Sequence, residues 1–85
     1  MDRNFPYVLL VNVEIAELQG LRDKAGEAIR YVGREPSDDL QVVYENEAIF
    51  FCFKNSTAAV LFELHCFRNQ IPRRRIGDPD WLRPR

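Results

Sequence analysis

Two segments of this chain are apolar at nearly every position, Tyr7 to Val13 and Ala48 to Lys54. Runs of this length, rich in β-branched and aromatic residues, are typical of buried β-strands. A further strand is expected from Leu40 to Glu45, directly before the second run. The turn at Glu45-Asn46-Glu47 predicts that these last two strands form an antiparallel hairpin.

Helical spacing of apolar residues predicts two helices. Apolar positions three and four apart predict an amphipathic helix from Glu14 to Val32, with Asn12 as its N-cap and Gly33 as its end. A polar loop is expected from Arg34 to Asp39. The second helix is expected from Ala58 to Asn69. Its candidate N-caps are three consecutive residues, Asn55, Ser56 and Thr57.

The order strand, helix, hairpin, helix predicts an α+β fold. It corresponds to a ferredoxin-like split β-α-β-β-α arrangement, with a three-stranded antiparallel sheet and two helices on one face. Residues 1–70 are expected to form this single domain. Residues 71–85 contain three prolines after Ile71 and lack periodicity, so they are expected as a basic, proline-rich C-terminal tail.

Side-chain alternation along the strands predicts which residues face the helices. The helix-facing set is expected to be Val8, Leu10, Ile49, Phe51 and Phe53. The opposite face is expected to present Leu9, Val11, Ala48, Phe50 and Cys52. Because a sheet face in water normally alternates apolar with polar residues, this second face is expected to be covered. Three covers fit: the tail through Trp81 and Leu82, a second copy of the chain, or another protein.

The second helix is apolar over a wider arc than contact with the sheet requires. Val60, Leu64 and Phe67 lie beside the expected sheet-facing row, where they fit either a wider core or a partner-binding surface. The residues expected to bind a partner are therefore Leu9, Val11, Phe50, Val60, Leu64, Phe67 and Trp81.

Charge is distributed unevenly along the chain. Residues 1–67 carry a net charge of −5, whereas residues 68–85 carry +4, with three consecutive arginines at 73–75. The basic segment is expected either to fold onto the acidic body or to bind an anionic partner.

The segments AIFFCFKNSTAAVLFEL (48–64) and VLLVNV (8–13) resemble the third strand, second helix and first strand of RNA-recognition motif domains. The resemblance implies a sheet that stacks bases on exposed aromatic residues. Phe50 matches one such position, whereas Leu9, Asn46 and Ala48 depart from the family pattern. The stretch FFCFKNSTAAVLFEL (50–64) is also similar to short segments of uncharacterised phage-encoded proteins.

Candidate catalytic and metal-binding groups are few. His65, Cys66 and Cys52 supply fewer N and S ligands than a structural zinc site needs, and adjacent helical residues diverge by about 100°. The acidic pairs at 38–39 and at Glu45 with Glu47 flank turns, where water is expected to solvate the carboxylates, whereas catalytic carboxylates need a concave, desolvated setting. We therefore expect no enzymatic activity, metal, cofactor or small-molecule substrate.

The sequence thus predicts a small non-enzymatic protein–protein interaction module. It is expected to homodimerise or to bind a larger assembly, as an accessory or inhibitor protein of a phage or mobile element does. The alternative is a single-stranded RNA- or DNA-binding domain in which Phe50 stacks on bases and Arg73, Arg74 and Arg75 contact phosphates. With no apolar stretch long enough to span a bilayer and no signal-peptide pattern, a cytoplasmic location is expected, with no membrane partner.

Overall fold

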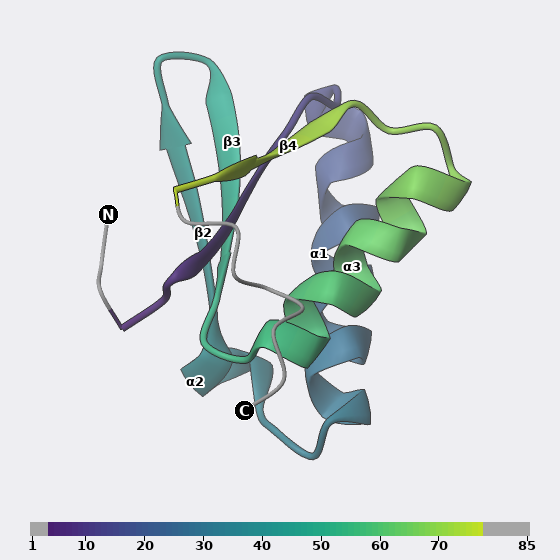
Figure 1. The fold of residues 1–85 in the computed structure, drawn as a ribbon. Helices are drawn as coiled ribbons and strands as arrows, with labels where there is room; N and C mark the ends of the chain where they lie inside the picture. Colours follow the sequence, from purple (N-terminus) through teal and green to yellow (C-terminus); the bar gives the residue numbers. More distant parts are fainter. Residues whose placement is uncertain (1–3, 78–85) are drawn as a thin grey trace.

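A four-stranded antiparallel sheet forms one layer of the molecule, and both long helices lie on the same side of it (Figure 1). This computed structural model describes residues 4–77. The elements are β1 (Tyr7–Val11), α1 (Ile15–Tyr31), α2 (Pro36–Asp39), β2 (Leu40–Glu45), β3 (Ala48–Phe53), α3 (Ser56–Arg68) and β4 (Arg73–Ile76). The strands lie in the order β2-β3-β1-β4, each antiparallel to its neighbour. The expected α+β class is confirmed, but the sheet has four strands where three were predicted.

The fourth strand, β4, lies within residues 71–85, the segment expected as a C-terminal tail. It pairs with β1, placing Arg73 opposite Val11 and Ile76 opposite Val8. The amide of Asn12 donates to the Pro72 carbonyl at 3.0 Å and extends this pairing by one step. Three consecutive arginines show no apolar alternation, so the sequence pattern did not reveal a strand that depends on main-chain pairing.

The register of the central strands corrects the predicted faces of β1. Leu9 lies opposite Phe51, and directly opposed residues of an antiparallel pair share one face of the sheet. Phe51 packs against Phe62 of α3, so both Phe51 and Leu9 face the helices. Leu9 and Val11 are 0% and 2% exposed and belong to the core, contrary to the expectation that they bind a partner. Because β1 is apolar on both sides, its sequence does not define which side faces inward.

The core is built around the aromatic rings of β3 and α3. The Phe62 ring centroid lies 4.7 Å from that of Phe51 and 5.4 Å from that of Phe53, and all three side chains are buried. On α1 the buried apolar stripe is Leu18, Leu21, Ala25, Ala28 and Ile29. Ile15, the first residue of the helix, is 79% exposed. The apolar face of α1 therefore starts at its second turn.

Local backbone geometry explains where several elements end. Gly33 has φ +78°, a left-handed conformation that glycine adopts without strain, and it follows the end of α1. Asn46 and Glu47 form the β2–β3 turn, with φ of 51° and 68°. Glu14, and not Asn12, is the N-cap of α1, because Asn12 takes part in the β1–β4 pairing.

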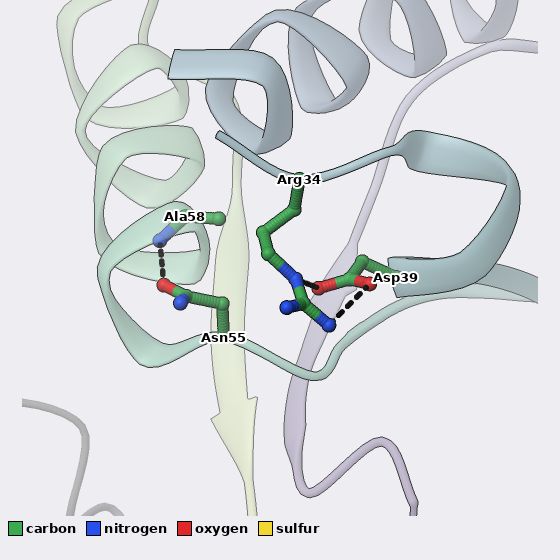
Figure 2. Close-up of polar contacts among 4 residues, drawn as sticks. All are labelled: Arg34, Asp39, Asn55 and Ala58. Carbon is green, nitrogen blue, oxygen red and sulfur yellow. Dashed lines mark hydrogen bonds and ion pairs between the residues drawn. The ribbon is translucent and has the colours of Figure 1, made fainter. Parts of the chain in front are cut away.

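Two polar contacts hold the chain where it enters and leaves the hairpin (Figure 2). The predicted loop 34–39 contains the short helix α2, which starts at Pro36. Asp39 at its end is 2% exposed, and its carboxylate accepts from Arg34 Nε at 3.1 Å. This hydrogen bond and the charge of Asp39 raise the pKa of the Arg34 guanidinium. At the other end of the hairpin, the Asn55 side chain caps α3 by accepting from the Ala58 amide at 3.0 Å.

Substituting Phe51 should test the assignment of the two sheet faces. Phe51→Ala removes a fully buried ring, so the free energy of unfolding measured in urea should fall by about 3 to 5 kcal/mol. Phe50→Ala is the matched control, because the neighbouring ring is only half-buried on the opposite face. The free energy of unfolding should fall clearly less in Phe50→Ala than in Phe51→Ala. Equal falls in the two variants would contradict the assignment of the two sheet faces.

A second substitution tests the Arg34–Asp39 pair. Arg34→Gln removes the cation beside a buried carboxylate, so the melting temperature should fall by several degrees. Adding Asp39→Asn removes that charge as well and should restore part of the loss. A double variant less stable than Arg34→Gln alone would show that the loss does not come from leaving the buried Asp39 charge without its cation.

Candidate functional site

Helix α3 turns one face to the core and another to the surface. Ala58, Phe62 and Cys66 are buried at a spacing of four residues. Leu61 and His65 of the same helix are only half-buried. On the outward flank, Leu64 is 40% exposed and Phe67 is 62% exposed. The helix therefore presents large apolar side chains that its own core does not bury.

These side chains line a surface groove between α3 and β4. We call it the α3–β4 groove, and it is lined by Val60, Glu63, Leu64, Phe67 and Arg73. Its volume is about 370 Å³. The structure thus brings together Val60, Leu64 and Phe67, three of the residues predicted to bind a partner. It adds Glu63 and Arg73, which apolar spacing on the helix could not identify.

Two arginines of β4 connect that strand to α3. The Arg73 guanidinium carbon lies 5.2 Å from the centroid of the Phe67 ring, within the range of a cation–π contact. Arg75 forms an ion pair with Glu63, in which its Nε lies 3.0 and 3.1 Å from the two carboxylate oxygens. Both side chains of this pair are largely shielded from solvent, at 25% and 20% exposure. The ion pair links β4 to α3 beside the groove, and the cation–π contact holds Arg73 against Phe67.

The other face of the sheet, which we call the outer face, carries a row of residues across all four strands. Val43, Phe50, Leu10 and Arg74 occupy successive positions in the row. The first three are half-buried, and Arg74 is exposed. Phe50 therefore lies on the outer face as expected, with Leu10 beside it in place of the predicted Leu9.

A second groove lies at the β1–β4 end of the outer face. We call it the β1–β4 groove, and it is lined by Leu10, Asn12, Pro72, Arg73 and Arg74. Its volume is about 340 Å³. Arg73 lines this groove and the α3–β4 groove, so the two meet at the start of β4.

The arginine triplet is divided between the two faces. Leu9 and Val11 face the helices, and their partners Arg75 and Arg73 share that side, whereas Arg74 lies opposite Leu10 on the outer face. Residues 73–75 therefore do not form one basic surface around Phe50. Trp81, the remaining residue predicted to bind a partner, lies outside the described residues.

The candidate nucleophiles lie in positions that favour packing. Cys66 and Cys52 are both buried. Burial raises the pKa of the Cys66 thiol to about 11, so it is protonated at neutral pH. The Asn69 side-chain amide donates to the His65 carbonyl at 2.8 Å and lies 3.3 Å from His65 Nδ1. Among residues 4–77 no group of three His, Cys, Asp or Glu side chains is placed to hold a metal ion.

Comparison with known proteins finds no matching family model, no matching curated protein and no matching solved structure. Separately, none of the helices in the described part of the chain combines the length and apolar character needed to cross a bilayer.

Thiol reactivity tests the environment of the two cysteines. Because the pKa of the Cys66 thiol is raised, only a small fraction of it is thiolate at pH 8. Burial also blocks the access of a reagent to both sulfur atoms. We expect the folded protein to react with an aromatic disulfide reagent far more slowly than the denatured protein does, as measured by thiolate absorbance. Fast reaction of Cys66 in the folded state, with Cys66→Ser as the reference, would contradict this description.

Proposed function

We propose that this chain is a small non-enzymatic binding module whose docking surface is the α3–β4 groove. The observation that carries the proposal is the exposure of Leu64 and Phe67 beside a groove with a cation at its rim. Large exposed apolar side chains clustered on a small domain mark interaction sites, and aromatic and arginine residues dominate the binding energy of interfaces. The partner is a protein, either a larger assembly or a second copy of the chain.

The groove is suited to recognition because its charged residues are already positioned. The Arg75–Glu63 ion pair holds β4 against α3, so little conformational freedom is lost there on binding. Arg73 adds one positive charge at the edge of an apolar surface. A partner that places an apolar side chain between Leu64 and Phe67, and a carboxylate near Arg73, would fit this arrangement.

The non-enzymatic part of the proposal is supported by the placement of the reactive groups. The Cys66 thiol is buried and protonated, which makes it a poor nucleophile. Glu45 and Glu47 lie at the exposed β2–β3 turn, where water solvates both carboxylates. Neither arrangement resembles a desolvated catalytic centre.

We further propose that the architecture is ferredoxin-like. The strand order β2-β3-β1-β4, with α1 following β1 and α3 following β3, supports this. The proposal concerns the arrangement of elements, and this architecture serves many unrelated functions.

Single-stranded nucleic acid is the second candidate partner. The row formed by Phe50, Leu10 and Arg74 on the outer face favours it, because stacking needs an aromatic ring near a cation that can contact phosphate. Against it, Arg75 is paired with Glu63 and Arg73 lies over Phe67. Binding of labelled oligonucleotides with a steep salt dependence, lost in Phe50→Ala, would favour this candidate over a protein partner.

Charge substitution in the groove tests the proposed docking surface. Leu64→Glu with Phe67→Glu should leave the fold intact, because both side chains are exposed, yet reduce partner binding roughly a hundredfold as two interface anchors are lost. Tyr31→Glu is the matched control, since Tyr31 is 81% exposed on α1. Partners captured by the wild type and by the control should be purified and their dissociation constants measured by calorimetry.

The same preparations identify a self-interaction. Absolute mass from light scattering on a sizing column distinguishes a monomer from a dimer, and the groove substitutions should convert a dimer into a monomer. Unchanged mass and unchanged partner affinity in the double variant would refute the α3–β4 groove as the docking surface.

A further inference from the structure

Strand β2 forms the edge of the sheet at the end opposite β4 (Figure 1). It pairs with β3 along its whole length, from Leu40 to Glu45, in one continuous register without a bulge. Its sequence LQVVYE is β-prone and contains no proline, lysine or arginine. Edge strands that stay unpaired are usually very short, or carry lysine, proline, a bulge or an inward-pointing charge. β2 has none of these protections.

The register with β3 determines which main-chain groups of β2 point away from the sheet. The Asp39 carbonyl accepts from the Lys54 amide at 3.2 Å, so these opposed residues form a hydrogen-bonded pair. Because such pairs alternate along an antiparallel ladder, the N–H and C=O groups of Leu40, Val42 and Tyr44 point to the outer edge. The Leu40 amide agrees with this direction, since it donates to a carbonyl of α2 and not to β3.

The outward main-chain groups of two residues are available to another strand. Within residues 4–77, the outward N–H and C=O groups of Val42 and Tyr44 have no hydrogen-bond partner. The Tyr44 side chain is 54% exposed, and that of Val42 is half-buried. Unpaired N–H and C=O groups in a row are a template for strand pairing. This edge can therefore accept one more strand.

A second copy of β2 is complementary to this edge. Antiparallel pairing about a two-fold axis through Val43 places Val42 of each copy opposite Tyr44 of the other. These are the residues with outward main-chain groups, so each such pair exchanges two hydrogen bonds. A β-branched residue opposite an aromatic one is a favourable cross-strand pair. Gln41 of each copy lies opposite Glu45 of the other, so the register opposes no like charges.

The charges of the two terminal strands favour β2 for self-association. β2 is uncharged from Leu40 to Tyr44, so nothing in this stretch repels a second copy. β4 carries three consecutive arginines, and two such strands side by side would bring like charges together. Only one of the two terminal strands therefore carries charge that opposes pairing with itself.

We propose that two copies of this chain associate through β2, with Val43 on the two-fold axis, so that two four-stranded sheets join into one continuous sheet. The inference goes beyond the proposed function. The α3–β4 groove lies at the other end of each sheet, so the dimer presents two grooves and can bind a multivalent partner with avidity. Because the pairing uses few residues, we expect a dissociation constant in the micromolar range or weaker.

Cysteine substitution on the two-fold axis tests the register. Val43→Cys places two thiols at a non-hydrogen-bonded position, where opposed Cα atoms lie about 4.5 Å apart and a disulfide can form. With oxidised glutathione the full chain should become a covalent dimer on a non-reducing gel. Gln41→Cys is the matched control, because it lies on the same face but about 13 Å from its own copy, and it should stay monomeric. The wild type, whose two cysteines are buried, is the reference.

Charge substitution tests the association without a cross-link. Val43→Lys and Val43→Glu should each raise the dimer dissociation constant roughly tenfold, because like charges then meet on the axis. An equimolar mixture of the two variants should regain wild-type association, as measured by sedimentation equilibrium. Gln19→Lys, a matched change of charge on the exposed side of α1, should associate like the wild type. Recovery in the mixture excludes a merely structural effect.

The outcomes separate this inference from the proposed function. A wild type that is monomeric up to roughly 1 mM would overturn the inference, as would equal cross-linking of Val43→Cys and Gln41→Cys. A dimer that ignores both charge variants would also overturn it. A dimer that dissociates in Leu64→Glu with Phe67→Glu would place self-association in the α3–β4 groove, against this inference and in favour of the proposed function. Partner affinity that is unchanged in that double variant counts against the proposed function alone.

Discussion

The antiparallel pairing of β1 with β3, with Leu9 opposite Phe51, is the constraint on which the rest of the structure depends. It turns the aromatic side of β3 toward Phe62 and so determines which flank of α3 is buried and which is left at the surface. It also leaves the other edge of β1 to β4, whose Arg73 and Arg75 then lie beside α3. The exposed groove is therefore a consequence of how the core packs.

Local signals in the sequence were sufficient for most of the elements. Apolar spacing located α1 and α3 to within about two residues, and the hairpin followed from β-prone runs around Asn46. The prediction of which β1 side chains face the helices was wrong, because both sides of the strand are apolar. Only the pairing of β1 with β3 decides which side faces inward. Strand β4 was missed because a run of arginines has no strand-like pattern and pairing over long sequence separation leaves no local trace.

The candidate site was accessible to sequence reasoning in part. Val60, Leu64 and Phe67 could be grouped because helical spacing places them on one flank of α3. Glu63 and Arg73 could not be included, because their roles depend on β4 lying beside the helix. The same missing strand explains why residues 73–75 were treated as one basic cluster, although pairing with β1 sends them to opposite faces.

Strand β4 also protects the rest of the sheet. Its neighbour β1 has the sequence YVLLV, a short, uncharged and strongly β-prone segment of the kind that aggregates when its edge is exposed. β4 covers that edge, and much of its attachment comes from main-chain pairing and from the contacts of Arg73 and Arg75 with α3. Local opening of this one strand would expose an aggregation-prone edge while the helices and hairpin remained folded, so the colloidal stability of the domain depends on its most polar strand.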